Sequence, residues 1–147
     1  MHSPILAPVV TLVAWSLVIM TWMYAVRFPA MRRKGISLSG RVGSKGGDLD
    51  GVVEPQVQWK AHNYNHLMEQ PTLFYAVALS LALMDFGGGL NLYLAWAYVG
   101  FRVAHSLVQS TTNVVKWRFL LFIGGSIVLA ALTIHALLAL FFHHQHG

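Results

Sequence analysis

The sequence contains no cysteine, and of its 147 residues only five are acidic and ten are lysine or arginine. Without cysteine the chain has neither a disulfide framework nor a thiol nucleophile of its own, so any thiol chemistry must use the thiol of a bound molecule. Charged residues make up 10% of the chain and hydrophobic residues 56%, whereas a typical soluble domain is about 25% charged. This composition predicts a protein whose main solvent is lipid.

Long apolar runs indicate how the chain is organised. Residues 4–26 carry no charge, and as a helix they would be roughly 34 Å long, enough to cross a hydrocarbon core about 30 Å thick. The first basic residue, Arg27, follows this run instead of preceding it, so we expect a retained helix and not a cleaved signal peptide. The runs predict a single domain over 1–147, an all-α integral membrane four-helix bundle. Its expected transmembrane helices are residues 4–26, 56–84, 90–112 and 118–142.

The distribution of basic residues predicts the topology. Lysine and arginine gather in the loop 27–55 and, as Lys116 and Arg118, in the last link, whereas the Gly-rich turn 87–89 has none beside it. Because basic loops stay in the cytoplasm, we expect a multi-pass protein of the bacterial inner membrane with both termini on the non-cytoplasmic side. Topology also explains the net charge of +5, so no nucleic-acid partner is expected.

Two polar stripes interrupt the apolar helices. Ionisable residues within a membrane span cost at least about 2.5 to 3.5 kcal/mol each at the bilayer centre, so they normally face a partner helix or a wet cavity. Glu69 and Arg102 are explained most simply as a structural ion pair, but one pair needs one partner each, and many more polar groups share this depth. An anion-accepting pocket is the better hypothesis. The stripes, at helical spacing, are Tyr98, Arg102, His105, Gln109 and Asn113 on one helix and His62, Asn65, His66 and Glu69 on another.

Two segments resemble a known family, the membrane-associated proteins in eicosanoid and glutathione metabolism (MAPEG). They are residues 60–75 (KAHNYNHLMEQPTLFY) and 98–118 (YVGFRVAHSLVQSTTNVVKWR), and the second has the family's spacing of sixteen between Arg102 and Arg118. The resemblance, to a divergent bacterial-type branch, implies a homotrimer of four-helix subunits. It also implies glutathione as co-substrate, bound between neighbouring subunits and open to the cytoplasmic side.

Residue roles follow from the resemblance alone. Glu69 would contact the glutathione amino group, and Arg118 would be the catalytic residue that stabilises the thiolate. His62 and His66 stand where the family's enzymes have arginine and asparagine, and Gln109 replaces a tyrosine that contacts glutathione. The glutathione backbone and carboxylates would be held by Arg102, His105 and Asn65.

An arginine beside the thiol suits this chemistry. A free cysteine pKa of about 8.5 leaves a few per cent thiolate at pH 7, and a cation within about 4 to 6 Å depresses an acid's pKa by about 1 to 3. The thiolate would attack an apolar small-molecule electrophile or a lipid hydroperoxide arriving through the bilayer. Two alternatives remain, a non-catalytic MAPEG-fold protein with a ligand-binding or structural role, and a small transporter or proton relay. No metal is expected, because the terminal histidines His143, His144 and His146 lack supporting residues.

Overall fold

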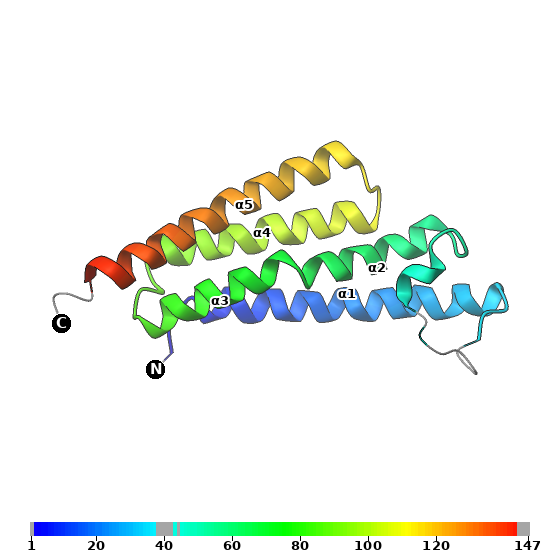
Figure 1. Ribbon diagram of the computed structural model, residues 1–147, viewed down its shortest axis with the longest axis horizontal. Helices are drawn as coiled ribbons and strands as arrows, with labels where there is room; N and C mark the ends of the chain where they lie inside the picture. Colours follow the sequence, from blue (N-terminus) through cyan, green and yellow to red (C-terminus); the bar gives the residue numbers. More distant parts are fainter. Residues whose placement is uncertain (1, 38–42, 44, 144–147) are drawn as a thin grey trace.

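The computed structural model describes residues 2–37, 43 and 45–143, and within them the chain is helical with no β-strand. The elements form four rods, of which the second is made of two helices end to end (Figure 1). This confirms the all-α four-helix prediction. In chain order the helices are α1 (Leu6–Arg33), α2 (Pro55–Leu67), α3 (Gln70–Leu83), α4 (Leu90–Ser110) and α5 (Val115–Leu138), with a 3-10 turn at Gly46–Leu49 and a π-helical turn at Ala139–His143.

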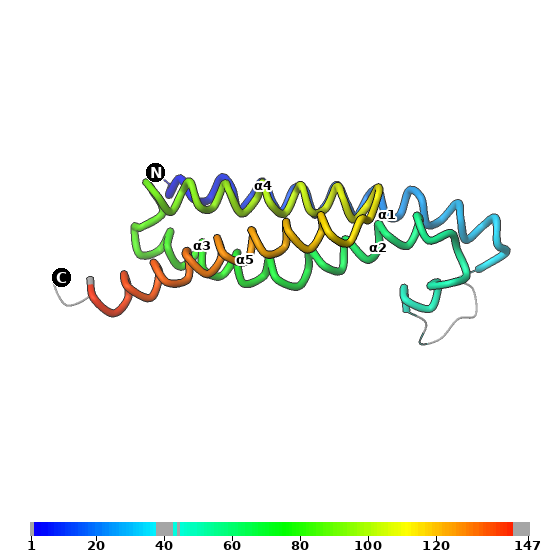
Figure 2. Tube along the Cα trace, turned by 90° about the horizontal axis from the view of Figure 1, so that it is seen from above, coloured from blue at the N-terminus to red at the C-terminus, as the bar shows by residue number. Residues whose placement is uncertain are grey.

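The rods lie roughly along one axis, with the two chain ends at one end of the bundle and the α1–α2 loop at the other (Figures 1 and 2). α4 contacts α1, α2 and α5, while α5 contacts α3 and α4. α4 thus contacts both α2 and α5, and residues of these three helices line the candidate site.

α1 continues past the expected boundary at residue 26 and takes Arg27, Arg32 and Arg33 into its last two turns. Arginine is a good helix former, and basic side chains are favourable at a helix C-terminus. The helix ends where Gly35 adopts φ +70°, with Gly35 N–H bonded to Arg32 O and Ile36 N–H bonded to Met31 O. This pair of bonds satisfies carbonyls that the helix end would otherwise leave free.

The helix expected over residues 56–84 is interrupted at Met68 and Glu69, where Glu69 has φ −95° and ψ −94°. Pro71 explains the position of the break. It has no N–H to give to the carbonyl of Leu67, four residues earlier, and its ring would clash with that carbonyl. α2 therefore ends at Leu67, and Pro71 occupies the first turn of α3, where a proline is tolerated.

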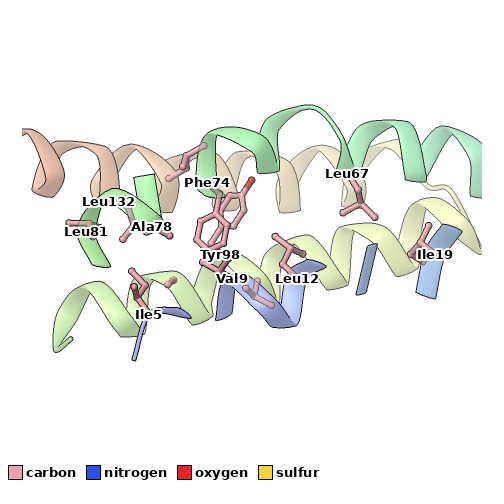
Figure 3. Packing of buried hydrophobic residues seen from close by; sticks show 13 residues of the cluster. Ile5, Val9, Leu12, Ile19, Leu67, Phe74, Ala78, Leu81, Tyr98 and Leu132 are labelled. Atoms are coloured by element: carbon pink, nitrogen blue, oxygen red, sulfur yellow. The ribbon is translucent and has the colours of Figure 1, made fainter. Parts of the chain in front are cut away.

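Apolar side chains from all four rods form the core (Figure 3). Phe74 of α3 stacks on Tyr98 of α4 with ring centroids 4.5 Å apart. The outer faces are apolar too: Val10, Ile127 and Phe141 are each more than 60% exposed. Two helices, Leu6–Arg33 and Val115–Phe142, are long and apolar enough to cross a membrane.

Polar side chains also connect the rods. Asn63 Nδ2 donates to the hydroxyls of Ser106 (2.5 Å) and Ser110 (2.8 Å), which joins α2 to α4. Gln70, beside the helix break, accepts from the Tyr98 hydroxyl at 3.1 Å and donates to Ser126 Oγ at 2.9 Å. These two bonds attach the chain at the helix break to both α4 and α5, and so hold the end of α2 in position.

Candidate functional site

A cavity of about 320 Å³ lies between α2, α4 and the first two turns of α5. Three apolar residues of α5, Val115, Phe119 and Phe122, form one side of it. Their spacing of four and three places them on one helical face. The polar lining consists of His66, His105, Gln109 and Arg118, among which there is no acid.

Arg102 lies behind this lining and is only 1% exposed. Its Nη2 is 2.6 Å from His66 Nδ1, while its Nε and Nη1 are buried with no hydrogen-bond partner among the described residues. Arg102 makes no salt bridge among the described residues, and burying a charge without a directly paired counter-ion is costly. A positive charge in a low-dielectric site also attracts anions strongly. The site therefore favours an anionic ligand.

Three rings of the cavity lining pack against one another. His66 stacks on His105 with centroids 4.8 Å apart and an interplanar angle of 17°, and Phe122 tilts against His66 at 5.6 Å. Within the part of the chain that the structure describes, His105 Nδ1 and Gln109 Oε1 are buried and have no hydrogen-bond partner. Both are groups that a ligand could satisfy.

Arg118 projects from the first turn of α5 and is held from the α4–α5 link. Its Nη1 donates to Asn113 Oδ1 at 2.6 Å. Asn113 has φ +53°, a left-handed conformation that asparagine tolerates better than most residues. A guanidinium has five N–H donors, so this bond orients Arg118 and leaves other donors for the cavity.

The structure brings four of the eight sequence-predicted site residues into one cavity lining, and places Arg102 directly behind them. The other three lie elsewhere. Glu69 is exposed at the helix break, although its charge acts on both Arg102 and His66. Asn65 lines a second cavity of about 430 Å³ between α1, α2 and the 3-10 turn, together with Arg27 and Lys45.

The side chain of His62, one turn before His66, contacts the first loop. Its Nε2 lies 3.0 Å from Asp50 Oδ1, and the same oxygen accepts from Gln58 Nε2 at 2.7 Å. Hydrogen bonds from Gln58 and His62 hold the pKa of Asp50 below its ordinary value of 3.8. His62 thus belongs to a loop contact and not to the cavity.

Sequence reasoning missed the aromatic side of the site. Phe119 and Phe122 were not among the predicted site residues, yet Phe122 follows Arg118 by four residues and so shares its helical face. That spacing could have identified Phe122 as a residue of the site. Of the terminal histidines, His144, His146 and the side chain of His143 lie outside the described residues, within which no three metal-binding side chains come together.

The fold and the cavity define a class of protein, a helical membrane-associated protein with a candidate ligand site that is lined by Arg118 and polar groups and by no acid. The MAPEG family model matches residues 5–138, and the chain belongs to the MAPEG family. No curated protein matches the chain. The family resemblance predicted from residues 60–75 and 98–118 is therefore confirmed.

Proposed function

We propose that this protein is a glutathione-dependent membrane transferase or peroxidase. The observation that carries the proposal is the cavity between α2, α4 and α5, which places Arg118 beside two imidazoles and in front of the buried Arg102. Glutathione carries two carboxylates and a thiol that can ionise, so it matches a site whose lining includes Arg118 and no acid, with the unpaired donors of the buried Arg102 behind it. Membership of the MAPEG family supports a glutathione-related function of this kind.

Arg118 is the residue we assign to the thiolate. Arginine stays charged when partly buried, and a cation beside the thiol favours its ionised form. In conjugation the sulfur would form a bond to an electrophilic carbon and the leaving group would depart with its electron pair. In peroxide reduction the thiolate would attack the terminal oxygen of a lipid hydroperoxide, break the O–O bond and expel an alkoxide, which takes up the proton that the thiol released and leaves as the alcohol. A second glutathione would then react with the sulfenic acid to give a disulfide and water.

The test is a titration of the purified protein in detergent with glutathione, recorded by thiolate ultraviolet absorbance. We expect a saturable signal for the wild type and its loss in Arg118→Ala, with turnover lowered by at least about tenfold because the pKa of the bound thiol rises by 1 or more. Lys116→Ala is the matched control, since Lys116 is an exposed cation two residues away that does not line the cavity. An Arg118→Ala protein with full thiolate signal would overturn the assignment.

The non-catalytic alternative rests on one contact, the 2.6 Å bond between Arg118 and Asn113, which already occupies one nitrogen of the guanidinium. A protein that only binds glutathione would show saturable binding, by calorimetry for example, without thiolate absorbance. The same titration therefore separates the two functions.

We also propose that all four rods cross the bacterial inner membrane, with both termini on the non-cytoplasmic side, and that three copies assemble. The ends of the chain lie together at the end of the bundle opposite the basic α1–α2 loop (Figure 1), as this topology requires. The lipid bilayer and two further copies of the chain would then be its partners. The particle mass in the same detergent preparation checks the assembly.

A further inference from the structure

We infer that His66 presents a fixed hydrogen-bond donor, its Nε2–H, to the cavity, and that this donor binds the anion held there. Arg102 is then a positioning residue that sets the tautomer of the His66 ring. The identity of the anion as glutathione thiolate rests on the proposed function, whereas the tautomer itself does not.

The contact between Arg102 and His66 decides where the ring proton lies. All five N–H groups of a guanidinium are donors and none of its atoms can accept. Because Arg102 Nη2 lies 2.6 Å from His66 Nδ1, Nδ1 must be the acceptor and carries no proton. The proton of the neutral ring is therefore on Nε2. Adding a second proton at Nδ1 would set two N–H groups against each other at this distance.

Packing keeps the ring in this orientation. One face of His66 stacks on His105, and Phe122 leans against the ring at an angle of 60°. A rotation of the imidazole by about 180° around its Cβ–Cγ bond would place Cδ2 where Nδ1 now lies, and the hydrogen bond from Arg102 would be lost. Arg102 is itself nearly fully buried, so it cannot follow such a turn. Both the direction and the donor character of Nε2 are thus fixed before a ligand arrives.

The Nε2 atom is available to a ligand. His66 lines the cavity and its Nδ1 faces Arg102, so the Nε2 edge of the ring is turned away from the guanidinium. The charged and titratable groups around the ring are Arg102 and His105 on α4, Arg118 on α5 and Glu69 at the helix break. An anion between His66 and Arg118 would receive one neutral and one charged donor from opposite walls. In this tautomer His66 cannot serve as the base that removes the thiol proton, because the nitrogen facing the cavity already carries a hydrogen.

The tautomer is tested directly by nitrogen NMR of the full-length protein labelled with 15N-histidine in detergent, without any ligand. The His66 signals, assigned by their disappearance in His66→Asn, should show an unprotonated Nδ1 and a protonated Nε2 at neutral pH. In Arg102→Lys the weaker, more mobile contact should allow the two tautomers to mix. A protonated Nδ1 in the wild type would overturn the inference.

The donor role is tested with two substitutions that separate the ring nitrogens. Glutamine can place an amide N–H near the position of Nε2, whereas asparagine can place an amide oxygen near Nδ1 and leaves nothing at Nε2. We expect His66→Asn to bind glutathione roughly ten- to a hundredfold more weakly, as for a lost hydrogen bond to a charged group, and His66→Gln to lie closer to wild type.

His135→Asn is the matched control, since His135 is also half-buried and hydrogen-bonded, to Asn91, but lies on α5 four turns beyond Phe119. If the wild type binds glutathione and both His66 variants bind equally well, the donor role is wrong while the proposed function stands. If the wild type fails to bind glutathione, the proposed function fails, and the NMR result still decides the tautomer.

Discussion

At the scale of single residues, Arg102 organises the site. It is 1% exposed, and within the described residues its only hydrogen-bond partner is His66. A buried cation with two unpaired nitrogens, Nε and Nη1, destabilises the fold, because an apolar residue of similar size would avoid the desolvation cost. Its presence is explained if a ligand supplies the missing negative charge.

Asp50 gives a residue-scale prediction about pH. Its carboxylate joins the first loop to α2 through Gln58 and His62, and these hydrogen bonds lower its pKa from 3.8 in the folded state. A carboxyl with a lowered folded-state pKa contributes stability that is complete above its ordinary pKa and is lost as the pH falls through the lowered value. The loop contact should therefore hold at neutral pH and loosen below about pH 4.

Hydrogen exchange of residues 46–53, corrected for the intrinsic effect of pH, measures this loosening. In Asp50→Asn the contact should already be weak at pH 6 and should change less on acidification. The neighbouring acids are the same in both proteins, so they cancel in the comparison. Identical pH profiles for wild type and Asp50→Asn would show that Asp50 does not hold the loop.

At the scale of the helices, periodicity predicted some features and missed others. The spacing of Tyr98, Arg102, His105 and Gln109 placed them on one side of a helix, and all four are buried on α4. The break at Glu69 was not predicted, because a proline in the first turn of a helix and a proline inside one look alike in sequence. The bonds of Gln70 to α4 and α5, which hold the break in place, depend on tertiary contacts.

The placement of His62 was missed for a related reason. His62 and His66 are one turn apart and share a face, so spacing alone assigned both to the pocket. The difference arises from Asp50, twelve residues earlier, which the first loop brings to His62. A loop of this kind has no periodicity from which its position can be read.

Two adjacent glycines of α5 give an element-scale prediction. A Cβ added at Gly124 would lie 2.6 Å from the ring of Phe101 on α4, whereas one at Gly125 would meet its nearest atom at an ordinary 3.5 Å. Gly124→Ala should therefore push α4 and α5 apart or force the ring to move, at a cost of about 1 to 3 kcal/mol. Gly125→Ala is a close control, because both substitutions gain the same helix propensity. Thermal or denaturant unfolding in detergent measures the difference, and equal stability of the two variants would contradict the close packing.

At the scale of the whole molecule, the orientation of the bundle in a membrane can be tested because the chain has no cysteine of its own. Single cysteines can be introduced and labelled in intact bacterial cells with a water-soluble maleimide that does not cross the inner membrane. The reagent needs an ionised thiol, and thiols in lipid are not ionised, so labelling reports water at each position. His2→Cys and Gly88→Cys, at the end with both termini, should react in intact cells, and Val52→Cys in the first loop should react only after lysis.

The decisive position is Ile127, in the middle of α5, which is 65% exposed in the isolated chain. If α5 crosses the bilayer or packs against another copy, Ile127→Cys should resist the reagent before and after lysis and react only after denaturation. If α5 lay in water, a side chain this exposed would react as readily as Gly88→Cys. Labelling of Val52→Cys and Gly88→Cys from the same side would exclude the proposed topology, because the α2–α3 rod separates these positions and would then not cross the membrane.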